Sequence, residues 1–169
     1  ALALLGDQPT QLLAAPCDAR RDLLAIGPPA TWRVIELPWL AQDDYDHLLW
    51  SCDLNLVRGE DSFVRAQWAG APMLWQIYPQ HDGAHVAKLD AWLDLMLADA
   101  PAGVAADVRQ AHRCWNGLAP AGSGPGLSAL AAWQRVQQRW AQHLGALPDL
   151  ATQLRAFVLQ QVANQRDNP

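Results

Sequence analysis

The sequence predicts an α/β protein: a Rossmann-like, doubly wound parallel sheet followed by C-terminal helices. Two observations lead to this fold class. Short apolar runs bounded by proline and glycine alternate with helix-like segments up to about residue 79, and from about residue 82 only helical spacing continues. The chain has 169 residues, 51% of them hydrophobic, which is enough for one core. We therefore interpret residues 1–169 as a single domain.

The first part of the chain contains four apolar runs that we expect to be buried strands: 10–16, 32–40, 52–57 and 71–79. Three segments with helical spacing lie between them: 17–27, 42–51 and 61–70. We expect Asp18 to cap the first of these helices and Gly27 to end it, and Asp61 or Ser62 to cap the third and Gly70 to end it. Short connections between such elements favour parallel βαβ units.

The second part of the chain is predicted to be helical over four segments: 84–99, 106–118, 127–147 and 148–162. The Gly/Pro/Ser-rich stretch 117–126 is interpreted as a surface loop within one domain. The helices after this loop need the sheet, or each other, to bury their apolar faces. Residues 163–169 are expected to be a frayed tail.

The composition excludes several classes of partner and location. The chain has 12 Lys+Arg against 17 Asp+Glu, a net charge of -5, which argues against nucleic acid or an anionic membrane but leaves a local basic pocket possible. No apolar run approaches the roughly 18 residues of a membrane-spanning helix, and no signal peptide is visible. The three cysteines have wide, irregular spacing, which indicates reduced thiols and a cytoplasmic protein.

A polar turn, "RGEDS" at 58–62, lies between a predicted strand and a predicted helix. Ligands of open parallel sheets bind at the carboxyl ends of the strands, and a helix start offers unpaired amides to a phosphate-like group. Arg58 can add a bidentate contact to a diphosphate, Gly59 allows close approach, and Ser62 offers a hydroxyl and an amide. The turn is therefore a candidate diphosphate site.

The two acids of this turn allow two interpretations. Glu60 and Asp61 can face away from a diphosphate and accept hydrogen bonds from sugar hydroxyls. Alternatively, Asp61 caps the helix, Glu60 is solvated, and Arg58 forms an ion pair with one of them. The chain has no GxGxxG or GxxxxGK[ST] motif, so spacing alone leaves both interpretations open.

The preceding predicted loop carries flat rings. Trp39 and Tyr45 can stack on a nucleobase, a contact worth roughly 1–3 kcal/mol per base, and the Gln42 amide can bind its edge. The alternative is that Trp39 and Tyr45 cover the core as half-buried residues.

The loop after the next strand brings four more polar or aromatic residues to the same edge: Tyr78, Gln80, His81 and Asp82. His81 and His85 are four residues apart, but we interpret them as surface residues because no metal-ligand cluster accompanies them. No metal or other cofactor is expected.

The segment from about residue 37 to residue 93 resembles the carboxyl-terminal half of the bacterial elongation factor P arginine rhamnosyltransferases. The most specific stretch is "RGEDSFVRAQWAG" followed by "IYPQ", and the flanks 1–36 and 94–169 fit by pattern and order of elements. The resemblance implies the C-terminal lobe of a GT-B glycosyltransferase. It also implies that the donor is dTDP-β-L-rhamnose, that an arginine of elongation factor P is the acceptor, and that the anomeric centre is inverted.

The resemblance also implies roles for individual residues. The thymine end would be bound by Trp39, Gln42 and Tyr45, although the family often has phenylalanine in place of Trp39 and Tyr45; the diphosphate and sugar would be bound by Arg58, Glu60, Asp61, Ser62 and Tyr78.

The catalytic residues on this chain would be Arg58, Glu60 and Asp61. Arg58 and the helix start at Ser62 would stabilise the leaving diphosphate. The general base would be an aspartate of the amino-terminal lobe, which this chain lacks, so the chain alone is expected to bind the donor without turning it over.

Two other functions stay open. The chain can be the nucleotide-sugar lobe of another GT-B transferase or of a GT-B-like epimerase. It can also be a non-catalytic module whose tryptophans, of which the chain has nine, bind a protein partner.

Overall fold

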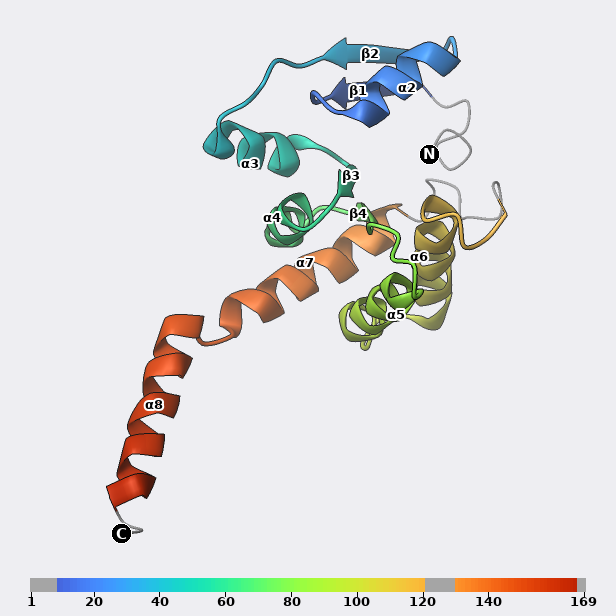
Figure 1. The fold of residues 1–169 in the computed structure, drawn as a ribbon. Helices are drawn as coiled ribbons and strands as arrows, with labels where there is room; N and C mark the ends of the chain where they lie inside the picture. The colour runs from blue at the N-terminus through green and yellow to red at the C-terminus, as the bar shows by residue number, and fades with distance from the viewer. Residues whose placement is uncertain (1–8, 121–129, 167–169) are drawn as a thin grey trace.

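The computed structural model describes residues 9–120 and 130–166 (Figure 1). The elements in chain order are β1 (Thr10–Ala14), α2 (Asp18–Ile26), β2 (Trp32–Glu36), α3 (Gln42–Ser51), β3 (Asn55–Arg58), α4 (Asp61–Ala69), β4 (Met73–Gln76), α5 (Ala84–Met96), α6 (Ala102–Trp115), α7 (Leu130–Ala146) and α8 (Leu150–Arg166). The predicted alternation of strands and helices, followed by helices, is confirmed.

The strands are parallel, as predicted, but they pair two by two. β1 pairs with β2 from Thr10 opposite Trp32, and β3 pairs with β4 from Asn55 opposite Met73. Within the described residues these are two separate two-stranded sheets, so the prediction of one continuous doubly wound sheet is wrong. The chain leaves β2 through Pro38, which has no backbone N–H to donate, and α3 then lies between β2 and β3 (Figure 1).

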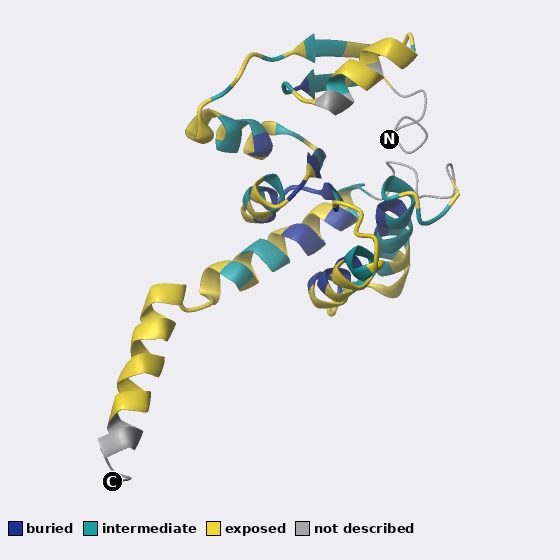
Figure 2. Ribbon diagram, in the orientation of Figure 1, coloured by how far each residue is buried: buried dark blue, intermediate teal, exposed yellow. Residues whose placement is uncertain are grey.

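The main core is built around β3 and β4 and the helices that surround them. β4 supplies buried Met73, Leu74 and Trp75, and α5 supplies Leu89 and Leu93. α4 lies beside this sheet, α6 packs against β4, and α7 crosses α4, α5 and α6 (Figure 2). None of the described side chains of β1, α2 and β2 belongs to this core cluster, in agreement with the separation of the two sheets.

Several boundaries differ from the predicted ones because the apolar runs extend beyond the paired residues. β2 ends at Glu36 instead of 40, β3 begins at Asn55 instead of 52, and β4 is limited to Met73–Gln76. α6 begins at Ala102, earlier than predicted, directly after Pro101, which occupies the N-cap position. The predicted loop 117–126 and the start of the third predicted helix fall largely on 121–129, which lie outside the described residues.

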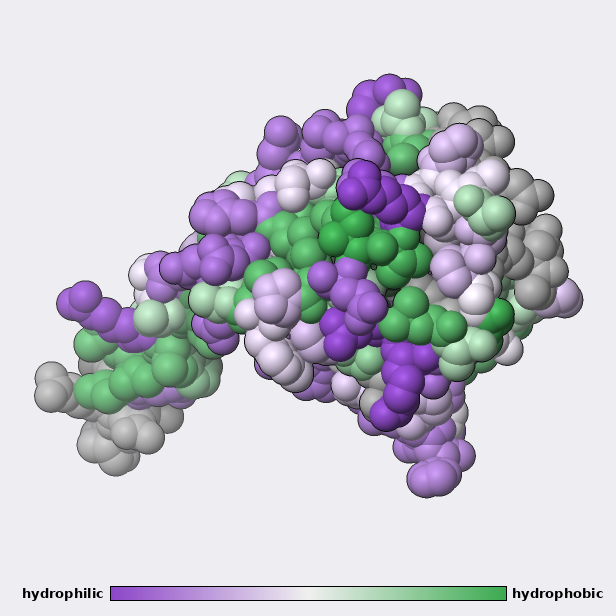
Figure 3. Space-filling view, turned by 90° about the horizontal axis from the view of Figure 1, so that it is seen from above, coloured by the Kyte–Doolittle hydropathy of each residue, from purple (hydrophilic) through white to green (hydrophobic). Residues whose placement is uncertain are grey.

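The last two helices behave differently from each other. α7 buries Trp133, Val136 and Gln137, as the prediction required. In contrast, every residue of α8 with a described side chain is exposed, so the expectation that this helix buries an apolar face is wrong (Figure 2). Hydrophobic residues gather on the part of α8 that projects at the left of Figure 3. The helix also continues to Arg166, through most of the predicted frayed tail.

Most of the tryptophans are buried or half-buried. Trp32, Trp75, Trp92 and Trp133 are buried, whereas Trp39, Trp50 and Trp68 are exposed. The side-chain oxygen of Gln67 accepts hydrogen bonds from the indole N–H groups of both Trp92 and Trp140, each at 2.9 Å. A buried glutamine thus satisfies two indoles from different helices.

The cysteines Cys17, Cys52 and Cys114 are thiols that form no disulfide among the described residues, as predicted. Burial, together with the nearby charge of Asp53, raises the pKa of Cys52. No helix among the described residues is both long and apolar enough to cross a membrane.

Candidate active site

Arg58 stands exposed at the end of β3, beside the start of α4. Its guanidinium carbon lies 5.1 Å from the centre of the Tyr78 ring, a cation–π contact. Within the described parts of the chain Arg58 forms no ion pair, so the alternative in which it pairs with Glu60 or Asp61 is wrong. The charge of this guanidinium remains available to an anion.

Gly59 closes the turn between β3 and α4. Its φ is +79°, a conformation that favours glycine, and its carbonyl oxygen accepts a hydrogen bond of 2.8 Å from the buried indole N–H of Trp75. The Gly59 N–H donates to the Gln76 carbonyl at 3.3 Å, which extends the β3–β4 ladder by one bond. The turn that carries Arg58 is therefore anchored to β4 on both sides.

The start of α4 is open to solvent. Glu60 occupies the N-cap position with helical backbone angles, and no described side chain caps the helix, so the predicted cap by Asp61 or Ser62 is wrong. Glu60 and Asp61 are exposed, and Ser62 is half-buried. Amides of an uncapped first turn keep their capacity to bind an anion, in line with the site proposed from the sequence.

The predicted base-binding residues lie on and before α3. Gln42 is the exposed first residue of α3 and Trp39, 85% exposed, precedes the helix, so the alternative that Trp39 covers the core is wrong. For Tyr45 that alternative is confirmed, since its half-buried side chain packs against the main core.

An ion pair fixes α3 to α4. Arg65 Nη1 on α4 donates to both carboxylate oxygens of Asp46 on α3, at 2.8 and 2.7 Å, and the side chains of both residues are only about 30% exposed. The hydrogen bond to Asp46 is also the main cause that raises the pKa of Arg65. Because Tyr45 directly precedes Asp46, this pair holds the predicted base-binding helix beside the predicted diphosphate-binding helix.

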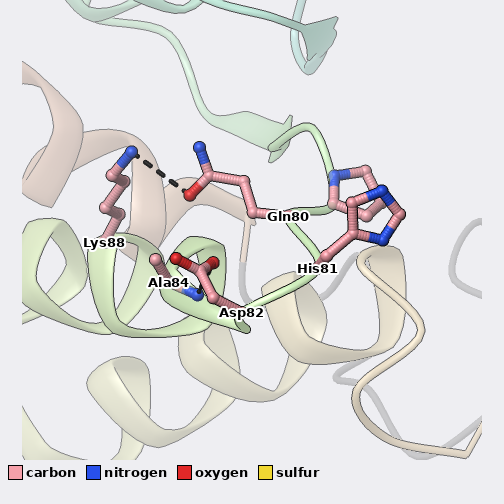
Figure 4. Close-up of a pocket in the computed structure, with 6 residues that line it drawn as sticks. Gln80, His81, Asp82, Ala84 and Lys88 are labelled. Carbon is pink, nitrogen blue, oxygen red and sulfur yellow. Dashed lines mark hydrogen bonds between the residues drawn. The ribbon is translucent and has the colours of Figure 1, made fainter.

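Beyond β4, the loop into α5 borders a shallow surface cavity of about 640 Å³ that is mostly open to solvent (Figure 4). Six residues line it: Pro79, Gln80, His81, Asp82, Ala84 and Lys88. The exposed Tyr78 precedes this loop and joins it to Arg58 through the cation–π contact. Of the two histidines interpreted as surface residues, His81 is exposed, and half-buried His85 accepts a hydrogen bond from the Gln80 N–H. Across the described residues, no three His, Cys, Asp or Glu side chains are grouped closely enough to hold a metal ion.

Comparison with known proteins decides the family. A model of the elongation factor P (EF-P) rhamnosyltransferase EarP matches residues 18–159. The chain belongs to the EarP family. A protein-arginine rhamnosyltransferase of Pseudomonas aeruginosa is 55% identical over 127 residues, which are 74% of this chain and 34% of that protein. One from Neisseria meningitidis is 37% identical over 143 residues, 76% of this chain and 36% of that protein.

The EarP relationship extends to structure. A solved structure described as the structural basis for EarP-mediated arginine glycosylation of translation elongation factor EF-P matches with a TM-score of 0.72 and 36% identity, covering 94% of this chain and 55% of that chain. The chain thus spans about a third of the length of the curated relatives and about half of the solved one.

Sequence reasoning missed Asn116, which secures the end of β4 in this EarP-family chain. Its Oδ1 accepts a hydrogen bond from the Ile77 N–H at 3.0 Å, and its Nδ2 donates to the Trp75 carbonyl at 2.8 Å. The Asn116 amide therefore bonds the backbone of β4 as a neighbouring strand would, next to Tyr78. Only the packing of α6 against β4 reveals this role, because Asn116 is about 40 residues from its partners.

Proposed function

We propose that this chain is the donor-binding half of a GT-B glycosyltransferase that moves rhamnose from dTDP-β-L-rhamnose to an arginine of elongation factor P. The observation that carries the proposal is Arg58: an exposed guanidinium with no acidic partner among the described residues, beside the start of α4. Relatives named as protein-arginine rhamnosyltransferases support the choice of reaction. Because the acceptor would be a translation factor, we expect the reaction to occur in the cytoplasm.

The diphosphate of the donor would lie across the turn 58–62. The dipole of α4 contributes only about 0.3–1 kcal/mol to binding a nearby charge. A charge-assisted hydrogen bond contributes about 1.5–3 kcal/mol, so Arg58 would dominate. The Ser62 hydroxyl and amide would complete the set of donors around the phosphates.

The thymine base would lie toward α3. The exposed ring of Trp39 is available for stacking, and the Gln42 amide can donate to and accept from a base edge. Tyr45 is packed against the core, so it would offer only the ring surface left uncovered. The ion pair between Asp46 and Arg65 would keep these residues at a constant distance from the diphosphate.

The reaction itself follows from charge. A guanidine nitrogen of the acceptor arginine attacks the anomeric carbon, the bond from that carbon to the phosphate oxygen breaks, and its electron pair leaves with dTDP. Arg58 and the amides of α4 stabilise the charge that develops on this leaving group. The guanidinium must lose a proton to a carboxylate, which we assign to the part of the enzyme absent from this chain. Glu60 and Asp61 would hold sugar hydroxyls, and no metal is needed because Arg58 supplies the positive charge.

Calorimetric titration of the chain with dTDP, dTDP-rhamnose, a UDP-sugar and a GDP-sugar tests the proposal. We expect the two thymidine ligands to bind and the other two not to bind. Arg58→Ala should weaken dTDP binding by about 10- to 100-fold, the equivalent of one charge-assisted contact. The matched control is Arg109→Ala, which removes an arginine paired with Asp94 elsewhere on the surface. A chain that binds no thymidine nucleotide, or that is indifferent to Arg58→Ala, contradicts the proposal.

A further inference from the structure

We propose that the side-chain amide of Gln80 binds the sugar of the nucleotide-sugar donor, and that Lys88 is the positioning residue for this amide. The inference rests on the proposed function and extends it to the cavity beyond β4 (Figure 4).

The backbone around Gln80 is fixed to the start of α5. The Gln80 N–H donates to His85 Nδ1 at 3.0 Å, and Asp82 Oδ1 accepts a hydrogen bond of 3.0 Å from the Ala84 N–H. Gly83, with a φ of +73°, makes the turn into the helix. Although exposed, the loop therefore presents Gln80 from a defined backbone position.

The orientation of the amide follows from its contact with Lys88. Lys88 Nζ lies 3.3 Å from Gln80 Oε1, and an ammonium group has only donors, so the oxygen of the amide must face Lys88. The Nε2 group, with two hydrogens, then takes the other position of the amide, where Figure 4 draws no bond to it among the lining residues. The Nε2 hydrogens of Gln80 can therefore be donated to a ligand bound in the cavity.

The order of the neighbouring loops indicates which part of the donor reaches this position. The predicted base-binding residues lie between β2 and α3, and the predicted diphosphate-binding residues lie between β3 and α4. The cavity lies after β4, the strand paired with β3, and Tyr78 connects it to Arg58. If the base lies at the loop after β2 and the diphosphate lies at the loop after β3, the sugar would lie at the loop after β4.

The lining of the cavity matches hydroxyl groups better than a further phosphate. The amide of Gln80 donates, while the carboxylate of Asp82 accepts and would repel another anion. Sugar hydroxyls both donate and accept, so they can use both groups. Lys88 shares the cavity but its ammonium is directed to Gln80 Oε1.

Calorimetry that compares dTDP-rhamnose with dTDP tests the inference, because only the first ligand carries the sugar. We expect Gln80→Leu to weaken dTDP-rhamnose binding by about tenfold, the size of one hydrogen bond, and to leave dTDP binding unchanged. Gln80→Glu keeps the size and the acceptor for Lys88 but removes the amide donors, so it should have the same selective effect. Gln142→Leu, an exposed glutamine on α7, is the matched control.

Lys88 is tested through the same selectivity. Lys88→Met should weaken dTDP-rhamnose binding several-fold without affecting dTDP, and Lys88→Arg, which retains a donor for Oε1, should restore it. Equal loss for both ligands in the Gln80 variants, or no loss at all, overturns the inference while leaving the proposed function intact. A wild-type chain that binds neither ligand overturns the proposed function first, and the inference with it.

Discussion

The ring of Tyr78 occupies the space that a side chain on Gly59 would need. A Cβ atom on Gly59 would lie 3.0 Å from both Cε2 and the hydroxyl oxygen of Tyr78. The same ring lies under the guanidinium of Arg58. The end of β3 and the segment after β4 thus meet through these three residues, and the position of the proposed diphosphate-binding cation depends on the absence of a side chain at 59.

We predict that Gly59→Ala weakens dTDP binding several-fold. The new methyl group would require the Tyr78 ring to shift by a few tenths of an ångström, and this ring orients the guanidinium of Arg58. The substitution also places a side chain at a φ of +79°, which costs about 1–2 kcal/mol of stability. Thermal unfolding measures the second effect, and calorimetry with dTDP measures the first.

Gly27→Ala is the matched control for this prediction. Gly27 also has a positive φ, +82°, but a Cβ atom there meets nothing within 4 Å. It should lose a similar amount of stability and bind dTDP as the wild type does. If both variants lose affinity equally, the loss comes from destabilisation and the orientation of Tyr78 is irrelevant to binding.

Removing the charge of Asp61 should change the affinities for dTDP and dTDP-rhamnose in opposite directions. A carboxylate near a diphosphate repels it, whereas a carboxylate can accept a hydrogen bond from a sugar hydroxyl. We therefore expect Asp61→Asn to bind dTDP slightly more tightly and dTDP-rhamnose several-fold more weakly than the wild type. The exposed Asp53, which lies between α3 and β3, provides the control variant Asp53→Asn. Parallel changes for the two ligands would show that Asp61 does not contact the sugar.

Gln67 joins two helices to α4 through one oxygen atom. Gln67→Leu would leave the indole N–H of Trp92, and that of Trp140, without the acceptor that each has at 2.9 Å. Each unsatisfied buried group costs about 1–3 kcal/mol, less for Trp140 because it is only half-buried. We predict a loss of about 2–4 kcal/mol in the free energy of unfolding, measured by urea denaturation. Gln142→Leu on the exposed face of α7 should change it by less than about 0.5 kcal/mol.

Much of the fold could be predicted because local signals and packing agree. Gly70, the predicted end of its helix, ends α4 in a left-handed conformation, and the predicted helix at 42–51 has the bounds of α3. The separation into two sheets could not be predicted. The apolar run at 32–40 indicates a buried strand, but it does not specify which other strands this one pairs with. The exposure of α8 could not be predicted either. The spacing of Leu150, Leu154 and Val158 specifies an apolar stripe but not the surface that would cover it.

The candidate site was predictable in part for a related reason. The position of Arg58 followed from the rule that strand ends carry ligand-binding residues, but its contact with Tyr78 depends on two strands lying side by side. Likewise Lys88 and Asn116 act on the loop after β4 through side-chain contacts that no sequence spacing records. Resemblance to a family supplied the proposed substrate, which spacing alone left open.

His112 provides a prediction about pH. The ring is completely buried between Trp92 and Trp133, and this burial lowers its pKa to about 4, although its hydrogen bond to the Val108 carbonyl acts in the opposite direction. An unfolded chain would protonate this histidine near its ordinary pKa of 6.5. The unfolded state therefore binds one more proton between about pH 6.5 and pH 4, so stability falls as the pH falls through that range.

The contribution of His112 to this pH dependence can be measured with a variant that lacks the imidazole. With one proton taken up per unfolding event, the contribution of His112 should decrease by about 2 kcal/mol between pH 7 and pH 5. His112→Phe keeps an aromatic ring among the tryptophans and removes the titrating group. Urea denaturation of both proteins at the two pH values should show that the wild type loses about 2 kcal/mol more than the variant. Equal losses would mean that His112 is protonated in the folded protein, and that the ring is far less shielded from water than its position between two indoles indicates.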